Sequence, residues 1–208
     1  MFDTPAERLY PIVDADVCRD HGLEPRSLAL ACFHGGARVV QLRVKSGSSA
    51  RFLELAEEVV AAAGTFGAAV IVNDRSDIAR LARAAGVHLG QDDLPPDAVR
   101  QVLGDGVIGL STHDPQQIDE ALRTPADYVA VGPVFRTITK DTGYSPRGLE
   151  LVQRAAGRGK PVVAIGGITL ERAPEVIAAG AGSVAVITDL LSGGTPESRV
   201  REYIRTLQ

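Results

Sequence analysis

The chain has 208 residues, which fits one large domain, and it is 45% hydrophobic and 23% charged, as is ordinary for a soluble globular protein. Its formal net charge of −4 gives no broad basic surface, so a nucleic-acid partner is not expected and any phosphate must be held by a local group of cations. No stretch approaches the ~18 consecutive apolar residues of a membrane span, and the first residues lack the features of a signal peptide. We therefore expect a cytoplasmic protein with no membrane partner.

Short β-branched runs alternate with longer helical stretches along almost the whole chain. Each run is mostly apolar and rich in Val or Ile, as expected of strands that are buried on both faces. The predicted strands are Leu9–Val13, Arg38–Leu42, Ala69–Val72, Val87–Leu89, Val107–Leu110, Tyr128–Val131, Val162–Ile165 and Ser183–Ile187.

Apolar residues between these runs recur at the spacing of a helix face. Such stripes are Phe52, Leu55, Ala56, Val59 and Val60, and then Ile78, Leu81, Ala82 and Ala85. Gly86 and Gly180 each follow a helical stretch and are interpreted as helix caps before the next strand.

Eight strands alternating with eight helices imply a parallel sheet. No linker or shift in composition divides the chain, so residues 1–208 are predicted to form one domain. Eight such units in one domain favour an α/β fold of the single-domain (β/α)8 TIM barrel type. The alternative, a flavodoxin-like or Rossmann sheet, would leave two or three of the units unexplained.

Polar residues gather where the second predicted strand ends, which is where barrels of this type carry their chemistry. Gln41, Arg43 and Lys45 alternate with apolar residues and so share one face. Two cations and an amide leaving a buried core need an anionic partner. Arg can donate two hydrogen bonds to the oxygens of one phosphate, and Lys supplies a flexible point charge. The alternative is a solvated strand end.

Acidic residues follow the next two strands, in Asn73-Asp74-Arg75 and in Gly90-Gln91-Asp92-Asp93. Neighbouring strand ends lie roughly 5 Å apart, and one or two carboxylates completed by substrate phosphates and water are the usual Mg²⁺ arrangement. Asp74 and Asp93 are therefore the predicted ligands of one Mg²⁺ ion. Alternatively, these carboxylates cap the following helices or form a general acid/base pair.

A hydroxyl and an imidazole follow the fifth strand, in Ser111-Thr112-His113. Either can contact a phosphate or a leaving group. His113 is a general base on one interpretation and a structural residue beside Ser111 on the other. His88, within the fourth strand, is interpreted as a core histidine and not as a ligand.

The connection from Gly132 to about Ser145 is the longest in the chain, and a long loop in a short-looped barrel is usually functional. Its hydroxyls and Lys140 suit a phosphate; the alternative is a merely flexible loop. Gly166-Gly167 follows the seventh strand and Thr188 the eighth, where such barrels bind phosphate through backbone N–H groups. Two anion sites across one barrel mouth predict a transferase that joins two phosphorylated substrates.

Several motifs in this order resemble those of the thiamine phosphate synthase family, over about Leu9 to Leu191. They are Gln41–Lys45 (QLRVK), Val72–Arg75 (VNDR), Gly86–Asp93 (GVHLGQDD), Gly109–His113 (GLSTH), Asp127–Lys140 (DYVAVGPVFRTITK) and Ala164–Thr169 (AIGGIT). That family joins a pyrimidine-methyl diphosphate to a thiazole phosphate and releases pyrophosphate. The resemblance implies these small-molecule partners and a Mg²⁺ cofactor, and it leaves a homo-oligomer open.

The resemblance also implies a role for individual residues. Arg43, Lys45, Ser111 and Lys140 would be catalytic, and Asp74 and Asp93 would bind Mg²⁺. The pyrimidine diphosphate would be held by Gln41, Leu42, Arg43, Val44, Lys45, Asn73, Ser111 and Lys140. The thiazole phosphate would be held by Thr137, Ile138, Thr139, Gly167, Ile187 and Thr188.

The mechanism of that family is dissociative: a pyrimidine-methyl cation forms, and the thiazole nitrogen then attacks it. No protein nucleophile is needed, and none stands out here. The sequence departs from the family pattern at Arg136, where proline is usual, at Thr188, where serine is common, and at Val44, where glutamate is frequent. None of these changes removes a cation or the carboxylate pair.

Two rivals remain at the level of sequence. A thiazole tautomerase on the same barrel has no need of a diphosphate site, so the set of Arg43, Lys45, Asp74, Asp93 and Lys140 argues against it. A non-catalytic barrel that senses thiamine phosphates would bind the ligands but release no pyrophosphate.

Overall fold

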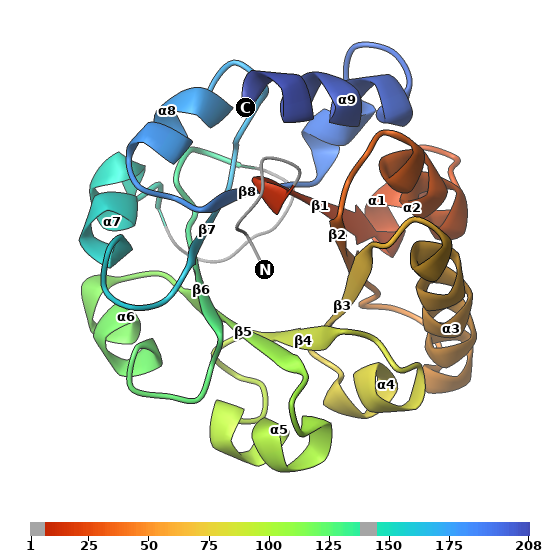
Figure 1. The fold of residues 1–208 in the computed structure, drawn as a ribbon, viewed down its shortest axis with the longest axis horizontal. Helices are drawn as coiled ribbons and strands as arrows, with labels where there is room; N and C mark the ends of the chain where they lie inside the picture. The colour runs from red at the N-terminus through yellow and green to blue at the C-terminus, as the bar shows by residue number, and fades with distance from the viewer. Residues whose placement is uncertain (1–6, 138–144) are drawn as a thin grey trace.

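A computed structural model describes residues 7–137 and 145–208 of the chain. Eight parallel strands close into a barrel in the order β1 to β8, with β8 paired to β1, and they form the inner ring of Figure 1. Their bounds are β1 Leu9–Asp14, β2 Val39–Arg43, β3 Ala69–Asn73, β4 Gly86–Leu89, β5 Val107–Thr112, β6 Tyr128–Val131, β7 Val162–Ile165 and β8 Ser183–Val186. The predicted (β/α)8 barrel is confirmed.

Helices surround this ring on every side (Figure 1). Two of them, α1 and α2, follow β1, and one α-helix lies between each later pair of strands. Their bounds are α1 Ala15–Asp20, α2 Pro25–His34, α3 Ser49–Thr65, α4 Ser76–Leu81, α5 Pro96–Leu103, α6 Pro115–Ala121, α7 Gly148–Ala155, α8 Ala173–Ala178 and α9 Pro196–Thr206, with a short 3₁₀ helix η2 at Thr188–Leu191.

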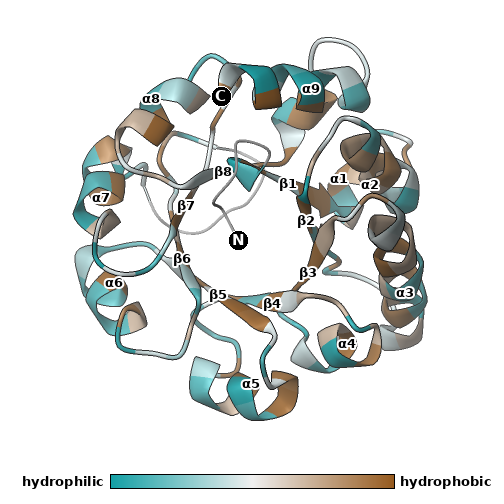
Figure 2. Cartoon of the chain, in the orientation of Figure 1, coloured by the Kyte–Doolittle hydropathy of each residue, from teal (hydrophilic) through white to brown (hydrophobic). Residues whose placement is uncertain are grey.

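Alternation along the strands produces two separate cores. Residues that point outward pack under the helices in one large cluster, which includes Val40, Leu42 and Val72. Residues that point inward, such as Val39 and Ile71, fill the barrel itself. Figure 2 shows apolar residues concentrated on the strands and hydrophilic residues on much of the helical ring. Since both strand faces are buried, the runs are apolar without a polar side.

Four strands extend beyond their predicted ends, and the added residues are polar. β1, β2 and β3 end at Asp14, Arg43 and Asn73, and β5 ends at Thr112. The parallel pairing continues through these positions, with Asp14 opposite Arg43 and Asn73 opposite His88. Strand pairing therefore holds the backbone of these polar residues at the carboxyl end of the barrel.

The local predictions at Leu81 and Gly86 are wrong. Leu81 is 61% exposed, because α4 ends there and the predicted apolar stripe does not continue as helix. Gly86 caps no helix but begins β4, where an added Cβ would lie 2.1 Å from the backbone oxygen of Val107 on β5. Gly180, with φ of +105° just after α8, does serve as a helix-end residue.

None of the helices that the structure describes is long and apolar enough to span a membrane.

We predict that Gly86→Ala will lower the free energy of unfolding by about 1–3 kcal/mol, because the methyl group forces β4 and β5 apart. Urea denaturation at constant m-value measures this. Gly64→Ala is the matched control, since Gly64 lies in α3 and a Cβ there meets open space; its stability should be unchanged or slightly raised. Equal stability of the two variants would contradict the close approach at Gly86.

Candidate active site

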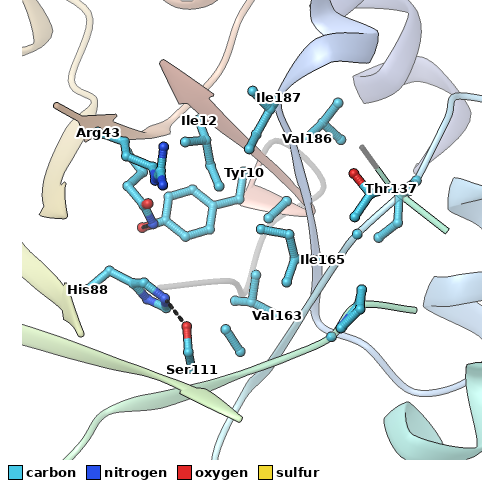
Figure 3. Close-up of a pocket in the computed structure, with 18 of the residues that line it drawn as sticks. Tyr10, Ile12, Arg43, His88, Ser111, Thr137, Val163, Ile165, Val186 and Ile187 are labelled. Atoms are coloured by element: carbon cyan, nitrogen blue, oxygen red, sulfur yellow. Dashed lines mark hydrogen bonds between the residues drawn. The ribbon is translucent and has the colours of Figure 1, made fainter. Parts of the chain in front are cut away.

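A cavity opens at the carboxyl ends of the strands, in the mouth of the barrel (Figure 3). One wall is apolar and includes Ile12, Val163, Ile165 and Ile187. The polar lining comes from the strand ends and includes Gln41, Arg43, Asn73, His88 and Ser111. The mixture suits a flat apolar ring with a charged or polar substituent, because a few oriented polar groups fix a ligand within an apolar pocket.

Arg43 is held by a buried partner. Its guanidinium is hydrogen-bonded to one carboxylate oxygen of Asp14, directly across the β1–β2 pairing. The other oxygen of Asp14 accepts hydrogen bonds from the backbone N–H groups of Asp16 and Val17, at 3.0 and 3.1 Å. Asp14 thus ties Arg43 to the first turn of α1. This pairing also compensates the charge of Arg43, which is only 15% exposed.

Lys45, Asp74 and Asp93 line a second cavity, together with other residues of the loop after β2. The ammonium group of Lys45 contacts a carboxylate oxygen of Asp74. Asp93 accepts a hydrogen bond from the backbone N–H of Gly90 at 2.7 Å. Desolvation raises the pKa of Asp93, and the nearby Asp74 raises it further. The two carboxylates line one cavity, as expected from neighbouring strand ends, and they repel each other.

The backbone at Asp74 is held in an unusual conformation, with φ of +65°. Asp is one of the few residues that visit this left-handed region, and such positions persist only where the surroundings impose them. Here the N–H of Asp74 donates to the carbonyl of His88 at 2.7 Å, which pins the turn against β4.

The donor set fits a shared Mg²⁺ ion. Within residues 7–137 and 145–208, no group of three or more His, Cys, Asp or Glu side chains gathers into a metal cage. Mg²⁺ is commonly held by one or two carboxylates and completed by substrate phosphates and water. Asp74 and Asp93 provide that number of carboxylates, and their mutual repulsion is the kind that a cation relieves.

Asn73 carries a buried hydrogen-bond donor at the first cavity. Its side chain is 6% exposed and lines the first cavity, and among the described residues its Nδ2 has no hydrogen-bond partner. A buried amide N–H without a partner costs free energy. An anionic ligand in the cavity would satisfy it.

Loops after β6, β7 and β8 form the other side of the first cavity. Gly166 and Gly167 have φ of +105° and +62°, and a Cβ on Gly167 would lie 2.4 Å from the backbone oxygen of Arg136. Glycine is thus required for the close approach of the two loops. Four of the predicted thiazole phosphate ligands line this cavity, namely Thr137, Gly167, Ile187 and Thr188.

The loop after β8 is anchored to α9. One carboxylate oxygen of Asp189 accepts hydrogen bonds from Arg199 at 2.8 Å and from Tyr203 at 2.6 Å. The same oxygen accepts from the N–H of Leu170 at 3.2 Å. These contacts hold the loops after β7 and β8 in one arrangement, which fixes the position of Thr188 beside Asp189.

The remaining predicted residues differ in where they lie. The side chain of Leu42 is fully buried in the outer core, so it could reach a substrate only through its backbone. Val44 lines the second cavity. Ile138, Thr139 and Lys140 lie outside the described residues. His113 lines the first cavity, and its Nδ1 lies 2.6 Å from the carbonyl of Gly132.

Sequence reasoning missed two kinds of site residue. His88 is buried, as predicted for a core histidine, but it also lines the cavity and lies 2.9 Å from the Oγ of Ser111. Tyr10 and Ile12 contribute to the same cavity from β1. Their inward alternation was a usable signal, since period 2 places them on the barrel interior. A polar residue at such a position near the carboxyl end of a strand faces the site.

A closed (β/α)8 barrel with cations, a carboxylate pair and a glycine-rich loop at its carboxyl mouth belongs to the class of barrel enzymes that act on phosphorylated small molecules. Residues 9–190 match the TMP-TENI family, described as thiamine monophosphate synthase. The chain belongs to this family, and the resemblance drawn from its motifs is confirmed.

Relatives agree over nearly the whole chain. The thiamine-phosphate synthase of Chlorobium luteolum is 41% identical over 90% of each chain. The thiamine-phosphate synthase of Koribacter versatilis is 42% identical over 96% of this chain and 95% of its own. The thiamine phosphate pyrophosphorylase structure from Pyrococcus furiosus superposes with a TM-score of 0.88 at 27% identity, and it covers 98% of this chain and 96% of that one.

We predict that Asp93→Asn will stabilise the metal-free protein at pH 7. Because the pKa of Asp93 is raised on folding, the folded state binds this proton more tightly than the unfolded state. Stability is therefore lost as the pH rises from the ordinary carboxyl value through the raised one. Asparagine does not ionise, so the gain should disappear below about pH 4.

Thermal unfolding across pH 3–8 with a chelator present measures this gain. Asp92→Asn removes an exposed carboxylate next in the chain and controls for the loss of one charge. A lower stability of Asp93→Asn at pH 7 would contradict the repulsion between Asp74 and Asp93.

Proposed function

We propose that this chain is a thiamine phosphate synthase, which joins a pyrimidine-methyl diphosphate to a thiazole phosphate and releases pyrophosphate. The observation that carries the proposal is the placement of polar and charged residues at and just after the ends of β2 and β3. Arg43 and Asn73 line the first cavity, while Lys45 and Asp74 line the second. One diphosphate reaching from the first cavity toward the second would meet two cations, a buried amide donor and a metal site.

The pyrimidine ring would lie in the first cavity. Its apolar wall of Ile12, Val163 and Ile165 covers a ring face and excludes water. Gln41 and Ser111, from β2 and β5, supply hydrogen-bonding groups at the ring edge. A water-poor environment also strengthens every charge interaction in the site.

The reaction begins when the bond between the pyrimidine methylene carbon and the diphosphate oxygen breaks. The electron pair leaves with the diphosphate, and a pyrimidine-methyl cation remains. Arg43 and Lys45 stabilise the growing negative charge on the leaving group. When bound by Asp74 and Asp93, Mg²⁺ supplies further neutralisation of the diphosphate oxygens. One ion per site is sufficient for this role.

The thiazole nitrogen then donates its lone pair to the methylene carbon, which forms thiamine phosphate. The phosphate of the thiazole substrate would be held by Thr188 and by the backbone at Gly167, and Ile187 would pack against the thiazole ring. Fixing both partners in one cavity makes the attack effectively intramolecular. Ile138, Thr139 and Lys140 retain the roles that the family resemblance implies for them.

The proposed setting is a cytoplasmic enzyme with small-molecule partners, whose residues 1–208 form one catalytic domain. A thiazole tautomerase would not use the carboxylate pair, and a sensor barrel would bind the substrates without turnover. The presence of Lys45, Asp74 and Asp93 around one cavity favours the synthase over both.

The direct test incubates purified protein with both substrates and measures pyrophosphate. We expect release that depends on Mg²⁺ and on the thiazole phosphate. Tautomerase activity without pyrophosphate, or tight binding without turnover, would each replace the proposal with the corresponding rival.

We predict that Asp93→Ala will reduce the rate of pyrophosphate release on the order of 100-fold, because a diphosphate leaves poorly when one of its charge-stabilising groups is lost. Circular dichroism should show an unchanged fold. Asp92→Ala, at the neighbouring exposed carboxylate, is the matched control. An unchanged rate in Asp93→Ala would remove Asp93 from the metal site.

A further inference from the structure

Five buried polar side chains form a continuous hydrogen-bonded chain across the barrel interior. Gln41 Nε2 donates to Tyr10 Oη at 3.2 Å, and Tyr10 Oη lies 3.0 Å from Tyr128 Oη. Tyr128 Oη lies 2.9 Å from Nδ1 of His88, and Nε2 of His88 lies 2.9 Å from Ser111 Oγ. Figure 3 shows the last of these bonds. Gln41 and Ser111, at the two ends of this hydrogen-bonded series, line the cavity, whereas Tyr128 is not among the lining residues.

The ring of Tyr128 is fixed by its neighbours. It stacks on His88 with ring centroids 5.7 Å apart and meets Tyr10 edge-on at 6.1 Å. Gly109 makes room for it, because a Cβ there would lie 2.0 Å from the ring carbon that carries the hydroxyl. Burial raises the pKa of Tyr128 well above its usual value, so its hydroxyl keeps its proton. The Tyr128 hydroxyl is therefore fixed in position and can donate one hydrogen bond.

His88 couples Tyr128 to Ser111. A neutral imidazole has one N–H and one lone pair. If Tyr128 donates to Nδ1, then Nε2 carries the proton and donates to Ser111 Oγ, and the proton of Ser111 is available to a ligand. If Tyr128 accepts from Nδ1, Ser111 must donate to Nε2 and offers a ligand only lone pairs. The orientation of the Tyr128 hydroxyl thus decides whether Ser111 can donate a hydrogen bond to a ligand or only accept one.

The direction of the hydrogen bond from Gln41 favours the arrangement in which Tyr128 donates to His88. Gln41 donates to Tyr10, and a Tyr10 hydroxyl that accepts there and donates to Tyr128 continues an aligned series. In such a series each bond polarises the next. We propose that Tyr128 is a positioning residue, which holds His88 as the neutral Nε2–H tautomer so that Ser111 donates its hydroxyl proton to an acceptor atom of the bound pyrimidine diphosphate. The identity of this ligand rests on the proposed function.

The tautomer of His88 can be measured without substrate. In protein labelled with ¹⁵N-histidine, long-range ¹H–¹⁵N spectra distinguish a protonated ring nitrogen from an unprotonated one. The chain has four histidines, and a His88→Asn variant identifies the relevant signals. We expect Nδ1 unprotonated and Nε2 protonated in the wild type. A protonated Nδ1, alone or with a protonated Nε2, would overturn the proposal.

The Tyr128→Phe variant tests the positioning role. It should shift the His88 nitrogen signals toward the other tautomer and lower kcat about tenfold, as expected for one misdirected hydrogen bond, with a smaller change in KM. Tyr203→Phe is the matched control, because Tyr203 is also fully buried but bonds to Asp189; the His88 signals should not move. Unchanged His88 signals and kcat in Tyr128→Phe would overturn the role.

The two proposals fail in different ways. A wild-type protein with the Nε2–H tautomer that releases no pyrophosphate would contradict the proposed function and leave the hydrogen-bonded chain standing. A synthase whose His88 is protonated at Nδ1 would contradict only the inference about Tyr128.

Discussion

The chemistry proposed for this barrel depends on repulsion between two carboxylates. Asp74 and Asp93 face one cavity, and the pKa of Asp93 is raised by burial and by Asp74. Lys45 contacts Asp74 and offsets part of this repulsion. A divalent cation bound with a diphosphate would neutralise the remaining charges. The cation would neutralise the carboxylates, and Lys45 and Arg43 would neutralise the diphosphate. We therefore propose that these charges favour a metal-bound diphosphate as the ligand of this cavity.

Closure of the barrel is what gathers these charges. Each of them lies at or just after the carboxyl end of a strand, and the eight strands share one ring. The outer core fixes the strands against the helices, and the inner core fills the barrel and lines part of the cavity. Anchors outside the cavity then orient individual groups: Asp14 holds Arg43, and Arg199 holds Asp189. Because these anchors are buried, they hold Arg43 and the loop after β8 in place without a ligand.

The barrel and the convergence of Asp74 and Asp93 at its rim could be predicted from sequence because both depend on local patterns. Apolar runs gave the strands, and residues following those runs included Arg43, Asp74 and Asp93. The contacts of His88 were not predictable in the same way, since its partners Ser111 and Tyr128 come from two other strands, β5 and β6. Gly86 was misinterpreted for a related reason: its requirement comes from the neighbouring strand β5 and not from the helix before it. The thiazole side could be proposed from Gly167 and Thr188, but their convergence is a property of the closed ring.

Anomalous X-ray diffraction from crystals soaked with Mn²⁺ and pyrophosphate would examine the charge arrangement most directly. Mn²⁺ accepts the same oxygen ligands as Mg²⁺ and can be located by its scattering. The account predicts one Mn²⁺ peak coordinated by Asp74 and Asp93 and by a pyrophosphate oxygen, with the pyrophosphate also contacting Arg43. A Mn²⁺ ion bound elsewhere, or pyrophosphate bound away from both the carboxylate pair and Arg43, would contradict it.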